Sequence, residues 1–333
     1  MELMKNLWPR ATQDKKTIVL PEGEEERTIV ASARILSENI ASLILIGDEN
    51  IIKSKALGLN VDLSEAVIIN PKTFDKKEFY AEQLYNIRKH KGMTIEAAKE
   101  LILDNVYFAT MMVKLDEADG MVSGAVHTTS ETIRPGLQII KTAPNASLVS
   151  SFFIMMIPNC EYGDDGLFLF ADCGINQDPT AEQLAAIAVQ TAKTAQHLCN
   201  MDPKVALLSF STKGSAEHES IDKIKKALDI AKTLNPTLNI DGELQLDAAI
   251  IPDIALRKAP GSSVAGYANI LIFPNLEAGN IGYKLVERFG KAQAIGPVCQ
   301  GFAKPINDLS RGCSTDDIVK AIVVTAVQAQ DNN

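Results

Sequence analysis

The chain has 333 residues, of which 46% are hydrophobic and 23% are charged, which is typical of a folded globular protein. Its formal net charge is −9, so it lacks the basic surface on which nucleic-acid binding depends. Any anionic ligand must therefore be held by local arginines and not by the overall field. A single hydrophobic core stops growing at roughly 250–300 residues, so two domains are expected.

Five cysteines are scattered along the chain without CxxC spacing, and the first residues, MELMKNLWPR, lack the apolar core of a secretory signal. Both features predict reduced thiols and a cytoplasmic protein. No apolar stretch reaches the ~18–20 residues that a bilayer requires, so no membrane partner is expected. The four histidines show no ligand spacing, and no metal site is predicted.

In the first part of the chain, short β-branched runs alternate with amphipathic segments. This rhythm predicts an α/β fold with a mostly parallel sheet and helices on both faces. The expected strands are 17–20, 43–47, 67–69 and 118–124, and the expected helices include 74–90 and 95–103.

The composition changes near residue 147, where a dense apolar run, SFFIMMIPN, begins. A second α/β domain is predicted over 148–297, inserted into a first domain made of 1–147 and 298–333, with a cleft between the two. The final helix, 318–328, is expected to pack onto the first domain. The strands predicted in the second domain are 167–170, 205–210, 270–273 and 292–295, the last ending at Gly296-Pro297, and the helices are 181–198, 221–234 and 276–289.

The stretch from Pro305 to Asp317, PINDLSRGCSTDD, is polar throughout and leads directly into the final helix. Loops of this kind commonly present chemical groups at the start of a helix. Ser314 and Asp317 have the spacing of a helix N-cap and its third helical residue, worth ~1 kcal/mol of stability. From these residues alone, a capping role for Asp317 is favoured over catalysis. Cys313, beside Arg311, is the most plausible low-pKa thiol, but an inert cysteine is favoured.

The segment SGAVHTTSETIRPGLQIIK predicts a turn of small residues before a helix that carries Arg134. Arg134 could pair with Glu131 three residues earlier, or grip a phosphate or carboxylate with two N–H groups. The residues leave these alternatives open. His127 is interpreted as a local hydrogen-bonding residue. Neither GxGxxG nor a complete P-loop is present, so phosphate would be bound by arginines and backbone amides.

Several long blocks of the chain resemble the phosphate acetyl/butyryltransferase family. They are DGMVSGAVHTTSETIRPGLQ, LFADCGINQDPTAEQLAAIA, the long block from DGELQLDAAIIPD to GYKLVERFG, and PINDLSRGCSTDDIV. The resemblance implies two α/β domains similar to those of isocitrate and isopropylmalate dehydrogenases, an interdomain cleft and a homodimer. It also implies reversible acetyl transfer between CoA and phosphate, with direct attack of the CoA thiolate on acetyl phosphate.

The resemblance assigns roles to individual residues. It implies that Asp317 accepts the thiol proton, that Ser310 lies at the thiol end of CoA, and that Arg311 binds phosphoryl oxygens. Arg134 matches a second phosphate-side arginine, and Arg88 one that binds CoA. Cys160 matches a thiol near the site that is not a nucleophile. No tightly bound cofactor is implied, because CoA, acetyl phosphate and phosphate are substrates, and acetate kinase is the implied pathway partner.

Three alternatives remain beside this interpretation. The closest is a phosphate butyryltransferase or another short-chain specificity. An NAD-linked decarboxylating dehydrogenase of the same fold would need a cluster of metal-binding aspartates, which the sequence does not supply. A non-catalytic acyl-CoA sensor is the third, and the presence of Ser310, Arg311 and Asp317 together argues against it.

Overall fold

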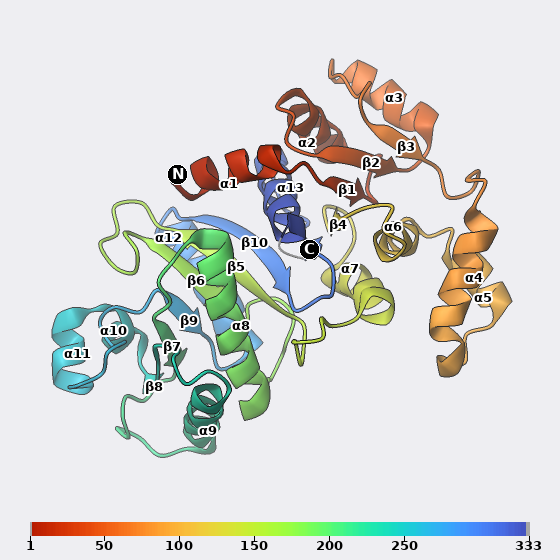
Figure 1. Cartoon of the computed structure of the whole chain (residues 1–333). Helices are drawn as coiled ribbons and strands as arrows, with labels where there is room; N and C mark the ends of the chain where they lie inside the picture. Colours follow the sequence, from red (N-terminus) through yellow and green to blue (C-terminus); the bar gives the residue numbers. More distant parts are fainter. Residues whose placement is uncertain (1, 331–333) are drawn as a thin grey trace. The chain divides into compact units, whose positions relative to one another are not determined.

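The structure is a computed structural model, and it describes residues 2–330 (Figure 1). It divides into two compact units, Met1–Ala143 with Phe302–Asn333, and Pro144–Gly301. The first unit is thus built from both ends of the chain, and the second is one continuous segment. The boundaries predicted from the sequence, after 147 and after 297, lie within a few residues of these limits. No helix in the described part of the chain is long and apolar enough to cross a membrane.

The first unit contains a five-stranded parallel sheet in the order β11-β4-β1-β2-β3. The predicted parallel sheet is therefore confirmed for this unit. Its central strand β1 supplies Ile18, Val19 and Leu20, which are buried on both sides. The strands are β1 (Thr17–Leu20), β2 (Ser42–Ile46), β3 (Val67–Ile69), β4 (Gly120–Ser123) and β11 (Ile306–Asp308).

Helices surround this sheet, and α13 (Thr315–Gln330) packs against α1 (Glu2–Gln13) and α2 (Glu26–Ser37), as Figure 1 shows. The prediction that the final helix packs onto the first domain is confirmed. The sequence did not indicate α1 or α6 (Asn105–Lys114); α6 is buried over most of its length, so its periodicity is weak. The remaining helices are α3 (Glu49–Gly58), α4 (Lys77–Arg88), η1 (Lys89–Lys91), α5 (Ile95–Leu101), α7 (Thr129–Pro135) and η2 (Gly136–Ile140).

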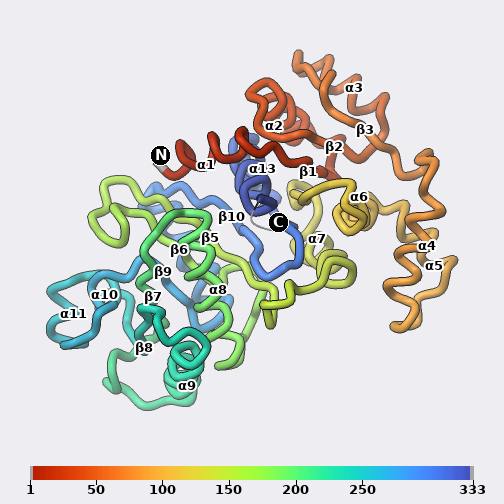
Figure 2. Tube along the Cα trace, in the orientation of Figure 1, coloured from red at the N-terminus to blue at the C-terminus, as the bar shows by residue number. Residues whose placement is uncertain are grey.

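The second unit contains a six-stranded mixed sheet in the order β10-β5-β6-β9-β7-β8. The four strands from β6 to β8 are parallel, whereas β5 pairs antiparallel with both β6 and β10. Helices α8 (Ala181–Cys199) and α9 (Glu219–Leu234) lie side by side in this unit (Figure 2). The other elements are β5 (Ser150–Met156), β6 (Leu167–Ala171), β7 (Val205–Leu208), β8 (Ile240–Leu244), β9 (Ile270–Ile272), β10 (Gln293–Gln300), α10 (Leu246–Ile250), α11 (Pro252–Lys258) and α12 (Leu276–Phe289).

Two predictions near the end of the chain were wrong. The strand expected to end at Gly296-Pro297 continues through both residues to Gln300, because β10 resumes its pairing with β5 after an irregularity at that point. The polar stretch from Pro305 is also not all loop, since it begins with the buried strand β11. A polar strand is tolerated there because the side chain of Asn307 donates to Thr325 Oγ1 at 2.8 Å.

Candidate active site

The loop between β11 and α13 presents Ser310 and Arg311 to solvent, as the sequence predicted for this stretch. It leaves the sheet at the carboxyl end of β11, which is parallel to β4. Open parallel sheets commonly bind ligands just outside the carboxyl ends of their strands. The loop is therefore the natural starting point for building a site.

The start of α13 is closed by a reciprocal cap between Ser314 and Asp317. The backbone N–H and the hydroxyl of Ser314 both donate to Asp317 Oδ2 at 2.8 Å, and the N–H of Asp317 donates to Ser314 Oγ at 3.2 Å. The predicted capping arrangement is confirmed. All contacts to the carboxylate use Oδ2, so the cap and a catalytic task for this half-buried side chain are compatible.

Cys313 is not an activated thiol. Its side chain is buried, and burial raises its pKa to about 11, although the nearby guanidinium of Arg27 acts in the opposite direction. A thiol in this state is almost entirely protonated near neutral pH and is a poor nucleophile. The structure thus contradicts the low-pKa alternative and agrees with the favoured inert cysteine.

Helix α7 carries Arg134 and begins with a complete capping box between Thr128 and Glu131. The carboxylate of Glu131 accepts from the N–H of Thr128 at 2.7 Å and from its hydroxyl at 2.9 Å. Arg134 instead donates to Ser130 Oγ at 3.2 Å. The alternative of an Arg134–Glu131 ion pair is not realised in the structure, where the charge of Arg134 makes only a minor contribution to lowering the pKa of Glu131. Arg134 is exposed, and its guanidinium can receive a ligand.

The helix with Arg134 and the loop with Arg311 are joined directly. Thr129, in the first turn of α7, donates its hydroxyl to Asp308 Oδ2 at 2.6 Å. Behind this bond, Gly124 has a φ of +112°, and a Cβ placed there would lie 2.5 Å from Asp308 Oδ1. Only glycine allows this approach of the two segments. Two arginines that are distant in sequence are thus carried by segments that hydrogen-bond to each other.

Asp308 lies between the two segments and is 1% exposed. Burial raises its pKa to about 6, against the opposing effect of the Thr129 hydrogen bond. Its Oδ1 has no hydrogen-bond partner among the described residues. A carboxyl in this environment changes its charge close to neutral pH.

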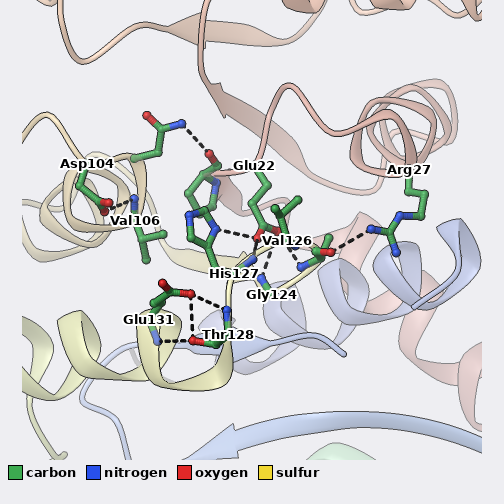
Figure 3. Close-up of polar contacts among 12 residues, drawn as sticks. Glu22, Arg27, Asp104, Val106, Gly124, Val126, His127, Thr128 and Glu131 are labelled. Carbon is green, nitrogen blue, oxygen red and sulfur yellow. Dashed lines mark hydrogen bonds and ion pairs between the residues drawn. The ribbon is translucent and has the colours of Figure 1, made fainter. Parts of the chain in front are cut away.

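The turn from Gly124 to His127 is organised around one buried carboxylate, that of Glu22 (Figure 3). Oε1 of Glu22 lies 2.8 Å from His127 Nδ1, so the interpretation of His127 as a local hydrogen-bonding residue is confirmed. Burial raises the pKa of Glu22, but the bonds from His127 and the backbone amides outweigh it and lower that pKa overall. The same bond to Glu22 raises the pKa of His127 despite its partial burial.

Arg88 is the last residue of α4, a helix that contacts α6. The phenol of Tyr107, on α6, feels both positive charges: burial raises its pKa, and the charges of Arg134 and Arg88 oppose that effect. The Nε atom of Arg88 is buried without a hydrogen-bond partner in the described part of the chain. The two arginines could therefore bind separate anionic groups of one extended ligand.

Cys160 belongs to the second unit, in the segment between β5 and β6, where it is half-buried. Its sulfur lies 4.0 Å from the carbonyl oxygen of Tyr162. The other predicted site residues belong to the first unit, and the place of Cys160 near the site stays a prediction.

Sequence reasoning missed Glu22 and Arg27. Both side chains bind the backbone of the turn before α7, and Arg27 also binds that of the loop between β11 and α13. Both lie in PEGEEER, the segment that follows β1. A polar, glycine-containing turn at the carboxyl end of a central parallel strand was the available signal. Among residues 2–330, no group of three or more His, Cys, Asp or Glu side chains is arranged to hold a metal ion.

Comparison with known proteins finds similarity over almost the whole chain. A family model described as "Phosphate acetyl/butaryl transferase" matches residues 2–326. The chain is 60% identical to a phosphate acetyltransferase of Clostridium acetobutylicum, covering 99% of both proteins. It is 58% identical to one of Thermoanaerobacterium thermosaccharolyticum, covering 99% of the chain and 100% of that protein. A phosphotransacetylase from Streptococcus pyogenes of known crystal structure is 45% identical, with a TM-score of 0.93 and coverage of 99% and 98%.

Proposed function

Because the chain belongs to the phosphate acetyl/butyryltransferase family, we propose that it is a phosphate acetyltransferase, an acyltransferase that converts acetyl-CoA and phosphate reversibly into acetyl phosphate and CoA. The observation that carries this proposal is the hydrogen bond between Thr129 and Asp308, which joins the helix bearing Arg134 to the loop bearing Arg311. This arrangement is suited to a ligand with several anionic oxygens.

In the proposed reaction, the thiolate of CoA attacks the carbonyl carbon of acetyl phosphate. The carbon–sulfur bond forms, the bond from that carbon to the bridging oxygen breaks, and phosphate leaves with the electron pair. Arg311 and Arg134 would bind the phosphoryl oxygens and stabilise their growing charge. Acetyl phosphate is already activated, so aligning the two substrates, worth up to ~7–11 kcal/mol, would supply most of the catalysis.

Asp317 would accept the thiol proton, and Ser310 would hydrogen-bond the reacting groups. Proton removal by a positioned base contributes roughly 10²–10⁴-fold to a rate. Arg88 would bind an anionic group of CoA, and Cys160 would lie nearby without reacting. The exposure of Ser310 and the half-buried position of Asp317 at the start of α13 support these roles.

The proposal is tested by mixing the purified protein with CoA and acetyl, propionyl or butyryl phosphate while following thioester absorbance. Rapid thioester formation with acetyl phosphate is expected, with lower rates for the longer acyl groups. A preference for butyryl phosphate would instead favour the butyryltransferase alternative, and absence of thioester with every acyl phosphate would refute acyl transfer.

Arg311→Ala is expected to lower kcat by at least about 10²-fold while the protein stays folded, because fixed positive charge at the leaving group would be lost. Lys291→Ala in the second unit is a matched removal of a surface cation and should leave the rate unchanged. Turnover of acetyl phosphate at the wild-type rate by Arg311→Ala would remove this residue from the chemistry.

The family resemblance extends the proposal to a cytoplasmic homodimer without a tightly bound cofactor, with acetate kinase as the enzyme that consumes acetyl phosphate. Light scattering at several protein concentrations tests the dimer, and a monomeric mass throughout would contradict it. Mass spectrometry of the purified native protein tests the absence of a cofactor.

A further inference from the structure

The segment Pro21–Arg27, which follows β1 and ends in the first turn of α2, contains two charged side chains, Glu22 and Arg27, that contact the backbone of the proposed site. The roles proposed above for the arginines, Ser310 and Asp317 do not use them. Glu22 is buried, and Arg27 is half-buried. Both side chains bind backbone groups of other turns, although their own segment contains no residue that was predicted for the site.

Arg27 connects the two loops of the site. Its Nη1 donates to the carbonyl oxygens of Arg311 at 2.9 Å and Cys313 at 2.8 Å. Its Nη2 donates to the carbonyl oxygen of Ala125 at 2.8 Å, and its Nε donates to Glu25 at 2.6 Å. A guanidinium has five N–H donors, and these bonds use four of them. Arg27 is thus committed to the protein and is not free to grip a substrate.

Glu22 binds the turn from Gly124 to His127, which Arg27 also contacts at Ala125. Its Oε2 accepts from the backbone N–H groups of Gly124 at 3.1 Å and Ala125 at 2.8 Å. Its Oε1 accepts from those of Val126 at 2.9 Å and His127 at 2.8 Å. The carboxylate therefore fixes the turn that ends at the capping box of α7, the helix of Arg134.

We propose that Glu22 and Arg27 are positioning residues that hold the turn before the Arg134 helix against the loop of Ser310 and Arg311. This inference rests on the proposed function, and it names the residues that set the geometry of the proposed site. Arg27 acts through the backbone of Arg311 itself, so its loss moves a phosphate-binding guanidinium without removing it. A substitution remote from the reacting atoms that misplaces a binding group by about 1 Å can cost up to ~10²-fold in rate.

The test compares Arg27→Gln, Arg27→Lys and Glu22→Gln with two control variants from the same region. Arg34→Gln removes an arginine of α2 that pairs with Glu38 and Asp316, and Glu26→Gln removes an exposed carboxylate of that helix. We expect Arg27→Gln to lower kcat/KM for acetyl phosphate by about 10²-fold and to change KM for CoA by less than threefold. Arg27→Lys should lie between it and the wild type, because an ammonium lacks the planar fork that reaches three carbonyl groups. Glu22→Gln should lower kcat/KM in the same way, and the controls should stay within threefold of the wild type.

A double variant separates positioning from a merely structural role. If Arg27 acts through Arg311, then adding Arg27→Gln to Arg311→Ala should lower kcat/KM less than threefold further. A further 10²-fold loss in the double variant would overturn the proposal. So would wild-type kcat/KM in Arg27→Gln accompanied by a lower Tm. If Arg27→Gln does not fold, Arg27→Lys is compared in the same way.

A binding measurement keeps this inference distinct from the proposed function. Inorganic phosphate should raise the Tm of the wild-type protein and of both controls, and this rise should be lost in Arg27→Gln and Glu22→Gln. A wild type that forms no thioester, but whose phosphate-dependent rise in Tm requires Arg27, would refute the transferase and retain the positioning role. A full rise in Tm in both variants would overturn the positioning role.

Discussion

Asp308 combines nearly complete burial with a carboxyl oxygen that lacks a partner among the described residues. Its pKa is raised from 3.8 to about 6, so folding favours the protonated form. The stability that this group contributes is therefore greatest below its unfolded pKa and is lost as pH rises through the folded value. The carboxyl is retained at a cost in stability near neutral pH, which is common at functional sites.

We expect Asp308→Asn to increase in stability relative to the wild type as the pH is raised. Between pH 5.5 and 8.0, the difference in unfolding free energy should move by roughly 1 kcal/mol in favour of the variant, because asparagine never acquires the buried charge. Urea unfolding at both pH values measures this difference. Asp14→Asn, on the surface, is the control and should show no comparable change. A difference that is the same at both pH values would contradict the raised pKa.

Asp317 has two proposed tasks, capping α13 and accepting the thiol proton, and substitutions at Ser314 and at Asp317 can separate them. Ser314→Ala removes the hydroxyl of the cap and should cost ~1 kcal/mol, a fall in Tm of a few degrees, with kcat close to that of the wild type. Asp317→Asn can still accept the bonds from Ser314, so its Tm should change little, whereas kcat should fall by roughly 10²–10⁴-fold.

Thermal unfolding and thioester formation, measured on both variants, decide between the tasks. An Asp317→Asn protein with a normal kcat would leave capping as the role of this residue. A large fall in kcat for Ser314→Ala, at an unchanged KM for both substrates, would mean that the cap itself aligns the base.

At the scale of helices and strands, local sequence signals predicted most of the fold and part of the site. The cap at Ser314, the parallel strands of the first unit and the packing of the final helix were all predicted from local patterns. Strand β11 was missed because its polar residues are buried through hydrogen bonds with distant partners such as Thr325. Helix α6 was missed because it is buried over most of its length and shows little periodicity.

In the candidate site too, local patterns were predictable and contacts between distant residues were not. Arg134 and Arg311 could be chosen from the sequence because each lies in a polar turn near the start of a helix. Glu22 and Arg27 also lie in a polar turn, but their role depends on the backbone atoms that they contact, which the sequence does not show. The bond from Arg27 to Arg311 spans 284 positions in the chain, and no local pattern encodes it. The alternative of an Arg134–Glu131 ion pair was not realised for a related reason, since i,i+3 spacing does not tell which neighbour a guanidinium takes, and Arg134 donates to Ser130.

For the whole molecule, the order of elements along the chain makes a prediction about how the first unit folds. Its sheet needs β11 and its core needs α13, and both follow the second unit in sequence. The two points where the chain leaves and re-enters the first unit lie side by side: Thr142 pairs with Phe302, and the N–H of Ala303 donates to the carbonyl oxygen of Lys141 at 3.0 Å. A turn of about two to five residues is enough to close such an antiparallel pair.

We therefore expect a shortened chain, in which Pro144–Gly301 is replaced by a short glycine-rich turn, to fold and to unfold cooperatively in urea. Residues 1–143 alone should not do so, because without α13 the apolar faces of α1 and α2 that pack on it are left exposed. Circular dichroism during a urea titration measures both proteins. The isolated segment 144–301 is the matched control and should fold, since all six strands of its sheet lie within it. If the shortened chain showed no cooperative transition while the isolated segment did, the first unit would depend on the second for its stability, and its own sheet and core would be insufficient.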